Sequence, residues 1–378
     1  MNESRSGKQL NIATVFSGIG APEQAFKRLG VNTNIVFACD NGEVEINYDL
    51  DKERAKILKL NGPVEKKKYV DDLYNQLTRK TNFVKKSYLA NYDLDPDYFF
   101  QDIRLLDGKD FCNKVDILIG GSPCQSFSTV GHQGGLEDTR GTLFFDYASL
   151  VKDVNPKVFI YENVRGMYNH DKGKTWNVIK NVFDQLGYDI KDAILNASDY
   201  GVPQTRRRLF VVGIRKDLHV AKMNWPPKKV PLETTMHDYL ISNAKFGNFK
   251  SINGKLVIKK EPGVVEPKYI LTPKLYAYVM STGTKNFYQK VEIDKPIART
   301  LLKTMGNHHR AGIDNYVSDL GVDKIRMLTE REAHRLMGFP DDYKIVVSRS
   351  QGYKQAGNSI VVDVLMAIYK ELFSCGAL

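Results

Sequence analysis

A strand, a tight turn and a helix are predicted in succession in the stretch IATVFSGIGAPEQAFKRLG, residues 12–30. Its first five residues are apolar or β-branched and predict a buried strand, whereas residues 21–30 have the pattern of an amphipathic helix that stops at a glycine. Gly18 and Gly20 separate the two elements and allow a tight turn in which the backbone can approach a ligand closely. This order is typical of nucleotide-binding α/β folds, although the third glycine of the dinucleotide pattern is absent.

The same alternation of strands and helices continues to about residue 210. Short apolar runs predict further strands at residues 34–40, 115–120, 157–163 and 208–214. Amphipathic stretches predict further helices at residues 144–154 and 176–187. A stretch rich in lysine and tyrosine, residues 63–98, looks like a partly helical insertion, to which the sequence assigns no role. The pattern predicts an α/β fold with a doubly wound sheet, whose ligands bind beyond the carboxyl ends of the strands.

Beyond residue 217 the sequence changes character. Residues 218–328 combine proline pairs, short β-like runs and polar loops with glycine, which predicts a separate, smaller and irregular domain. A helix at 328–340 with Thr329 as N-cap follows, and we expect an apolar helix at 358–373 to pack back onto the first domain. The predicted organisation is therefore a first domain at 1–217, a second at 218–328 and a returning helical segment at 329–378.

The composition is that of a globular protein of 378 residues, of which 42% are hydrophobic and 26% are charged. No apolar run approaches the roughly 18 residues that span a bilayer, and the first residues lack the apolar core of a secretory signal. We therefore expect a cytoplasmic protein without membrane contacts. The four cysteines and seven histidines do not lie at zinc-ligand spacings, so neither a metal site nor a disulfide framework is expected.

The net charge of +11 is concentrated in the second predicted domain, where residues 218–328 contain 18 lysines and arginines against 9 acidic residues. A basic segment of this kind indicates a polyanionic partner such as a nucleic acid. A solvated, lysine-rich surface explains the same charge equally well. The charge alone therefore does not choose between the two interpretations.

Two carboxylates end neighbouring strands at the edge where ligands bind. Asp40 ends the strand at 34–40, and Asp102 lies where a third strand would end. An acidic residue at the second strand end is expected to accept hydrogen bonds from ribose hydroxyls. A glycine turn beside two carboxylates suits a neutral or cationic adenosine ligand better than a pyrophosphate, which favours S-adenosylmethionine (SAM) over NAD.

Cys124 occupies an unusual position in the stretch GGSPCQSFS, residues 120–128. Two glycines and a proline end a strand there and polar residues follow, so an inert core cysteine, the commonest state of this residue, is not favoured. Glu162 ends the next predicted strand, and Arg206 and Arg208 flank the start of the last one. Taken alone, Glu162 could be a helix cap or an ion-pair partner, and the two arginines could form a basic strand edge. Together with the cysteine they predict one site with a nucleophile, an acid and an oxygen clamp.

Six motifs resemble, in order, those of the bacterial C5-cytosine-specific DNA methyltransferases of restriction-modification systems. They are VFSGIG (15–20), GSPCQSFS (121–128), RGTLFFD (140–146), YENVRGM (161–167), PQTRRRLF (203–210) and QAGNSIVV (355–362). The resemblance runs from about residue 12 to the C-terminal helix and is interrupted only by residues 63–98 and 218–328. It implies a Rossmann-like SAM-dependent methyltransferase domain and, at 218–328, a smaller irregular, β-containing target-recognition domain.

The resemblance implies transfer of a methyl group from SAM, leaving S-adenosylhomocysteine, to C5 of a cytosine flipped out of duplex DNA. Cys124 would add to C6, Glu162 would hold and protonate the base, and Arg208 would contact O2, with Arg206 beside it. The positions where the family contacts SAM are occupied by Phe16, Gly18, Gly20, Asp40, Asp102, Ile103, Pro123, Leu143, Asn358 and Ser359. The DNA-contacting positions are occupied by Gln204, Thr129, Val130, Arg140 and Thr300.

Two positions and one segment depart from the family pattern. Asp40 is one methylene shorter than the usual glutamate, and Asn41 stands where many relatives place an aromatic residue against the adenine. After the cysteine, STVGHQGG (128–135) puts Thr129 or Val130 in the region from which relatives can fill the gap left by the flipped base. The sequence names neither the residue that fills this gap nor the base that removes the C5 proton.

The resemblance also implies how the chain would meet its partners. We expect a monomer that binds duplex DNA through the basic second domain, with an affinity that falls steeply as salt rises. Residues 281–290 and 304–312 are the candidates for base recognition, and the family implies a restriction endonuclease encoded separately as a partner.

Three other functions account for parts of the same pattern. An RNA cytosine-5 methyltransferase of related architecture and a catalytically silent DNA-binding protein on the same fold stay open. An NAD-dependent dehydrogenase, which the glycine turn alone would suggest, leaves Cys124 and the two arginines unexplained.

Overall fold

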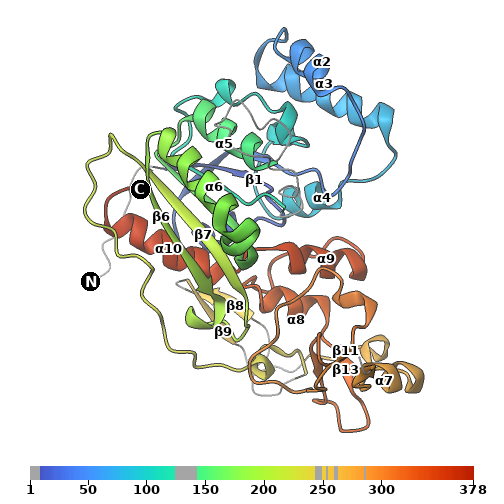
Figure 1. The fold of residues 1–378 in the computed structure, drawn as a ribbon. Helices are drawn as coiled ribbons and strands as arrows, with labels where there is room; N and C mark the ends of the chain where they lie inside the picture. Colours follow the sequence, from blue (N-terminus) through green and yellow to red (C-terminus); the bar gives the residue numbers. More distant parts are fainter. Residues whose placement is uncertain (1–8, 124–142, 243–248, 253, 259–262, 285–286) are drawn as a thin grey trace.

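The computed structural model describes residues 9–123, 143–242, 249–252, 254–258, 263–284 and 287–378. The described residues form a lobe built around a large sheet and a second lobe of short elements. In Figure 1 the sheet and its helices, coloured mostly blue to green apart from the red helix near the C-terminus, lie above the second lobe, which is drawn mostly in orange.

A seven-stranded sheet in the order β3-β2-β1-β4-β5-β7-β6 forms the centre of the first lobe. Its strands are β1 Leu10–Val15, β2 Thr33–Cys39, β3 Phe99–Phe100, β4 Ile117–Gly120, β5 Val158–Val164, β6 Tyr188–Asn196 and β7 Arg207–Arg215. Strands β1 to β5 run parallel, whereas β7 is antiparallel to β5 and β6. The predicted α/β fold class is confirmed, and the reversal places the start of β7 at the edge where the parallel strands end.

Helices cover both faces of this sheet. Helices α1 Ala21–Leu29 and α10 Val362–Ser374 lie on one face, and α5 Leu143–Val154 and α6 Lys174–Gln185 lie on the other. Because successive residues of a strand point to opposite faces, Ile12 of β1 packs with Phe26 of α1, whereas Ala13 belongs to the cluster of Phe144 in α5. The first lobe is therefore a three-layer structure.

The helices near the C-terminus differ in part from their predicted bounds. The helix predicted at 328–340 is the shorter α8 Glu330–Arg335, and its predicted cap is confirmed, because the Thr329 hydroxyl accepts a hydrogen bond from the Glu332 amide at 3.1 Å. The apolar C-terminal helix begins at Val362, since the preceding residues form a separate helix, α9 Arg349–Asn358, which was not predicted. The expected packing onto the first lobe is confirmed by the rings of Phe26 and Tyr369, which stack at 3.9 Å.

The insertion at 63–98 is helical in part, as predicted. Helices α2 Leu50–Ile57, α3 Gly62–Leu77 and α4 Phe83–Leu89 lie beside the sheet edge formed by β2 and β3. The buried Lys66 fixes α3 to the segment before β4, because its Nζ lies 2.7 Å from the Asp107 carboxylate and 2.9 Å from that of Asp110. The insertion is thus docked against the first lobe.

The described part of residues 218–328 is built from short elements, and the predicted domain boundaries at 217 and 328 stay predictions. Its hairpins and helix are β8 Phe249–Ile252 with β9 Lys255–Ile258, β10 Gly283–Thr284 with β11 Phe287–Tyr288, β12 Tyr316–Val317 with β13 Arg326–Met327, and α7 Pro273–Val279. Short 3-10 helices occur along the whole chain at Pro96–Tyr98, Ile103–Leu105, Gly108–Phe111, Arg165–Gly173, Ala197–Asp199, Met236–Tyr239, Pro267–Tyr269 and Met305–Asn307. Within the described ranges, no helix is long and apolar enough to cross a membrane.

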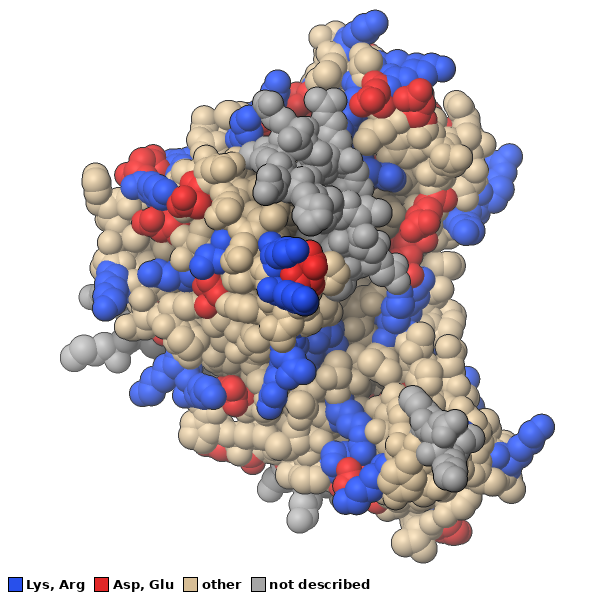
Figure 2. All heavy atoms as spheres, in the orientation of Figure 1, with Lys and Arg blue, Asp and Glu red and all other residues tan. Residues whose placement is uncertain are grey.

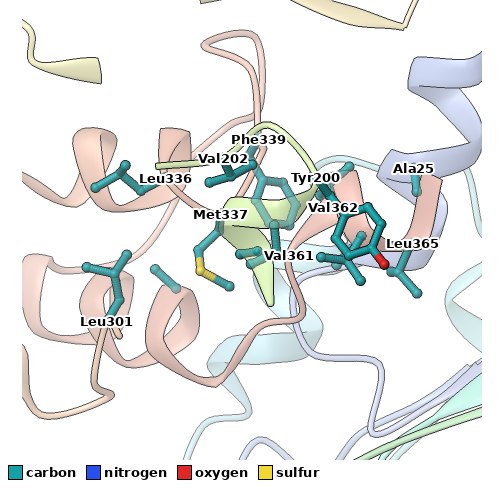
Figure 3. Packing of buried hydrophobic residues seen from close by; sticks show 14 of the residues in the cluster. Ala25, Tyr200, Val202, Leu301, Leu336, Met337, Phe339, Val361, Val362 and Leu365 are labelled. Atoms are coloured by element: carbon teal, nitrogen blue, oxygen red, sulfur yellow. The ribbon is translucent and has the colours of Figure 1, made fainter. Parts of the chain in front are cut away.

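The two lobes meet through an apolar joint. Figure 3 shows Met337 and Phe339, which follow α8, together with Val361 and Val362 at the start of α10 and with Val202. All five are buried members of one hydrophobic cluster that contains residues of both lobes. A joint of this kind holds the edge of the sheet and the second lobe in a fixed relation.

Candidate active site

The predicted site residues converge at one edge of the sheet. The glycine turn follows β1, Asp40 follows β2, Asp102 follows β3 and residues 121–123 follow β4, while Glu162 lies near the end of β5. The carboxyl ends of parallel strands share an edge, and the antiparallel register, which pairs Val164 with Arg208, brings the start of β7 to that edge as well.

The glycine turn after β1 is shaped by three residues with positive φ. Phe16 has φ 51°, Gly18 has φ 53° and Gly20 has φ 77°. Among the described residues, a Cβ atom on Gly18 would meet only the Phe16 carbonyl oxygen, at 3.9 Å, so these residues leave the backbone of Gly18 uncovered. The turn therefore offers backbone that a ligand can approach closely.

Asp40 fixes this turn. One carboxylate oxygen accepts a hydrogen bond from the Gly18 amide at 2.9 Å, and the other accepts one from the Gly42 amide at 2.7 Å. Burial raises the pKa of Asp40, although both amide hydrogen bonds oppose that shift. Each oxygen keeps a second lone pair, so the predicted ribose contact is compatible with the geometry and stays a prediction.

Asp102 is surrounded by donors from three residues. Its Oδ2 accepts hydrogen bonds from the hydroxyls of Tyr48 at 2.6 Å and Tyr74 at 3.1 Å, and from the Arg104 guanidinium at 2.8 Å. Its Oδ1 accepts from the backbone amide and Nε of Arg104, both at 3.0 Å. Because these hydrogen bonds use the carboxylate lone pairs, the main role of Asp102 in this structure is to support the loop that carries the buried Ile103. A direct contact of either residue with SAM stays a prediction.

Glu162 and Arg208 form the central pair of the site. The Arg208 Nε lies 3.3 Å from the Glu162 carboxylate, across the β5–β7 pairing. Burial raises the pKa of Glu162, and the positive charges of Arg208 and Arg206 only partly oppose this shift. A Cβ atom on Gly121 would lie 2.5 Å from the Glu162 backbone oxygen, so only glycine fits between the end of β4 and the carboxylate.

Asn163, which the sequence analysis did not single out, holds the segment that leads to Cys124. Its amide nitrogen donates hydrogen bonds to the Ser122 carbonyl oxygen and to the Tyr161 hydroxyl, both at 2.9 Å. The Ser122 hydroxyl lies 2.7 Å from the same Tyr161 hydroxyl. This buried network fixes the backbone after β4, and the only sequence signal for it was the position of Asn163 directly after Glu162.

Four predicted residues lie outside the described residues: Cys124, Thr129, Val130 and Arg140. Pro123, the last described residue before this range, is exposed at the end of β4. The roles predicted for the four residues stay predictions.

Gln204 corrects one prediction. It was expected to contact DNA, but its side chain is 0% exposed. Its amide nitrogen donates to the Leu336 carbonyl oxygen at 2.8 Å, and its amide oxygen accepts from the Leu301 backbone amide at 3.1 Å. In this structure the residue cannot reach a nucleic acid. It joins the loop before β7 to α8 and to the segment around residue 301.

Arg206 was predicted to lie beside Arg208 in the site, but its side chain contacts backbone from other segments. Its guanidinium is buried and donates hydrogen bonds to the carbonyl oxygens of Leu301 at 3.0 Å, Gly357 at 2.9 Å and Ser359 at 2.8 Å. Burial and the neighbouring Arg208 lower the pKa of Arg206 to about 9. The structure thus places Arg206 behind the site as a connector of three segments.

The remaining predicted residues lie around the same edge. Leu143 is partly buried at the start of α5, and Ser359 is buried at the end of α9. Asn358 is exposed and donates a hydrogen bond at 3.0 Å to Glu43, a residue of the loop after β2. The Thr300 hydroxyl donates to the Thr205 carbonyl oxygen at 2.6 Å and borders a cavity of about 390 Å³ at the base of the second lobe.

The arrangement can hold a cationic adenosine ligand and an acid–base pair. Across the described part of the chain, no cluster of three or more histidine, cysteine, aspartate or glutamate residues could hold a metal ion. Figure 2 shows lysines and arginines on the visible face of both lobes and a hollow in the outline between them. A polyanion seated between the lobes would meet this charge.

Comparisons with known proteins identify similar chains. The family model "C-5 cytosine-specific DNA methylase" matches residues 76–374. The type II methyltransferase M.HpaII of Haemophilus parainfluenzae is 36% identical over 302 residues, which cover 76% of this chain and 79% of the relative. M.HhaI of Haemophilus parahaemolyticus is 38% identical over 256 residues, which cover 67% and 74%.

Solved structures share the fold at low sequence identity. The crystal structure of the S. pombe Dnmt2 methyltransferase matches with a TM-score of 0.65 at 16% identity, and covers 98% of this chain and 100% of its own. The Entamoeba histolytica methyltransferase EhMeth matches with a TM-score of 0.60 at 17% identity, covering 97% and 99%.

Proposed function

The chain belongs to the C-5 cytosine-specific DNA methylase family, and we propose that within this activity Cys124 adds to C6 of a cytosine flipped out of a specific site in duplex DNA. The protein is thus a DNA (cytosine-5) methyltransferase and uses SAM, as its family does. The observation that supports the role of Cys124 best is the Glu162–Arg208 pair, which lies beside the segment that leads to Cys124.

Glu162 is the acid of the proposed mechanism. Attack on C6 pushes electron density toward C5 and onto the ring nitrogen N3, so a proton donor at N3 stabilises the adduct. Burial raises the pKa of Glu162 and favours the protonated carboxyl that such a donor needs. Glu162 would therefore hold the base by its N3 edge and supply this proton.

Arg208 is the proposed partner of the cytosine O2. Its side chain is 19% exposed and keeps donor groups beyond the Nε that faces Glu162. A guanidinium at O2 would stabilise the negative charge that develops when Cys124 adds. Arg206 would act on this step only through its effect on the position of β7.

The cofactor fits the edge formed by the first three strand ends. SAM supplies an electrophilic methyl group when it is bound. The open backbone at Gly18, the acid Asp40 and the apolar side chains of Phe16, Ile103 and Leu143 match the needs of an adenosine bearing a positive charge. We propose Gly20, Asp102, Pro123, Asn358 and Ser359 as further contacts at the same edge.

The second lobe, residues 218–328, is the proposed target-recognition domain. It carries most of the net positive charge, and Tyr288 of β11 exposes 72% of its surface within one predicted base-recognition segment, 281–290. Thr300 lies on the surface at the base of this lobe and is the proposed phosphate contact, with 304–312 as the second recognition segment. Thr129, Val130 and Arg140 would contact DNA from the first lobe.

The setting of the reaction is proposed from the relatives named as type II methyltransferases. We infer a monomeric cytoplasmic enzyme that protects DNA against a separately encoded restriction endonuclease. Its affinity for duplex DNA should fall steeply as the salt concentration rises.

Transfer of tritium from methyl-labelled SAM tests the substrate. The purified protein should label plasmid DNA at cytosine C5 and leave tRNA unlabelled. Labelling of tRNA without labelling of duplex DNA would overturn the substrate assignment, and labelling of neither would favour a silent DNA-binding protein.

A further inference from the structure

The insertion at 63–98 contacts the loops after β1, β2 and β3, which are the three loops assigned to the cofactor. We propose that this insertion is a cofactor-positioning element, in which Tyr92, Asn82 and Tyr74 hold these loops in the shape that binds SAM. The inference rests on the proposed function, because it takes SAM to bind at these strand ends. Each contact is made by a different residue of the insertion to a different loop.

Tyr92 supports the glycine turn after β1. Its hydroxyl donates a hydrogen bond to the Gly20 carbonyl oxygen at 2.6 Å and lies 3.3 Å from that of Ile19. Its ring fills the space beside Gly20 so closely that a Cβ atom there would lie 2.1 Å from the ring. The turn with φ 77° at Gly20 is therefore packed closely against the insertion.

Asn82 supports the loop after β2. Its amide nitrogen donates to the Asp40 carbonyl oxygen at 2.7 Å. Its amide oxygen accepts from the Lys85 amide at 2.9 Å and so caps α4 at the same time. A Cβ atom on Gly42 would lie 2.3 Å from that amide oxygen, which shows how closely the cap and the loop are packed. The start of α4 is thus tied to the residue whose side chain holds the glycine turn.

Tyr74 supports the loop after β3. It is 2% exposed on α3, and its hydroxyl donates to Asp102 Oδ2 at 3.1 Å. Tyr48, which precedes the insertion, donates to the same oxygen, so the carboxylate is held between α3 and the loop that follows β2. Asp102 and the neighbouring Ile103 are therefore placed by a helix that lies outside the sheet.

The insertion has its own anchors, which allow it to act as a fixed support. Tyr88 of α4 is fully buried, packs its ring against Phe99 of β3 at 5.4 Å and donates a hydrogen bond to Glu23 of α1 at 2.5 Å. The Ser87 hydroxyl donates to the side chain of Gln355 in α9 at 2.9 Å. These contacts fix α4 on both the sheet and α9.

The double variant Tyr74→Phe/Tyr92→Phe removes two of the supporting hydroxyls and keeps both rings. Each lost hydrogen bond should weaken SAM binding by a small factor, so we expect the Kd for SAM, measured by equilibrium dialysis, to rise roughly three- to tenfold. The KM for SAM should rise with it, while kcat at saturating SAM and the Kd for duplex DNA should stay at the wild-type values. This split separates positioning of the cofactor from a general loss of structure.

The matched control is Tyr69→Phe. Tyr69 lies on α3 like Tyr74 and donates its hydroxyl to the Glu53 carboxylate of α2, which is not a cofactor loop. The control should keep the wild-type Kd for SAM. A double variant with an unchanged Kd for SAM, or one whose DNA affinity falls by the same factor, would overturn the inference. Should the double variant fail to fold, the Kd values of Tyr92→Phe alone for SAM and for DNA decide in the same way. A wild-type protein that binds no SAM would instead overturn the proposed function on which the inference rests.

Discussion

Glu162 shows how the surroundings of one side chain set its chemistry. Its carboxyl lies between the end of β4 and Arg208, where burial favours the neutral acid and the two arginines favour the anion. Burial is the larger effect, so the pKa is raised and the proton is retained to higher pH than in a free glutamate. A proton donor for cytosine N3 needs this state.

The variant Glu162→Gln should lower turnover by roughly 10²–10⁴-fold, because a neutral amide can hold the base but cannot give it a proton. The Kd for SAM should not change. In the wild-type enzyme the protonated form is present below the raised pKa and is lost as pH rises through it, so single-turnover rates should fall toward high pH and this fall should be absent in the variant. Equal losses of turnover and SAM affinity would instead indicate a structural role.

Site residues were predicted best where an ionisable side chain lies at the end of a predicted strand. Glu162 and Arg208 were placed together because the ends of neighbouring strands share one edge, and the structure brings them within 3.3 Å. Gln204 and Arg206 were placed at the same rim, yet their partners Leu336, Leu301 and Gly357 lie 95 or more positions further along the chain. Contacts at such separations leave no local pattern from which a buried role could be predicted.

At the scale of elements, β7 is held in place by a buried connection. Arg206, which directly precedes this strand, donates to carbonyl oxygens in the segment around Leu301 and at the end of α9. Arg208 is the second residue of this strand, so its position in the site depends on this connection.

We expect Arg206→Met to lower the free energy of unfolding by roughly 3 kcal/mol or more, because three buried carbonyl oxygens lose their donor. Arg208→Met should change it by about 1 kcal/mol or less, since this side chain is partly exposed, yet should abolish most of the turnover. Urea denaturation and methyl-transfer rates measured on both variants check this contrast. Equal stability of the two variants, or full activity of Arg208→Met, would contradict it.

Helices and strands whose apolar residues recur at a regular spacing were predicted, whereas those held mainly by tertiary contacts were not. The missed strand β6 has a sequence, YDIKDAILN, that mixes charged and apolar residues, because it lies at the sheet edge, where only Tyr188 and Leu195 of the strand are buried. The missed helix α9 contains two glycines and few apolar residues, and one of these glycines, Gly357, packs so closely on Leu302 that a Cβ atom would lie 2.4 Å from its carbonyl carbon. Neither element carries a local signal strong enough to predict it.

At the scale of the whole molecule, function depends on how the two lobes and the insertion are assembled. The apolar joint around Met337 and Val361 sets the second lobe against the edge where the strands end. The insertion also contacts the loops at that edge, and most of the net positive charge lies in residues 218–328. The sequence predicted the concentration of positive charge and both interruptions of the family pattern, residues 63–98 and 218–328. How these segments are arranged around the site depends on contacts between residues far apart in the chain.

Covalent trapping tests the account as a whole, because it needs the cofactor edge, the flipped base and Cys124 assembled together. Duplex DNA in which 5-fluorocytosine replaces cytosine throughout cannot release the enzyme after methyl transfer, since C5 carries fluorine in place of the proton that must leave. We expect a stable complex that forms only with SAM present, with the DNA mapped to Cys124 by mass spectrometry, and no complex with Cys124→Ser. A complex attached at another residue, or one formed equally by Cys124→Ser, would contradict the central claim.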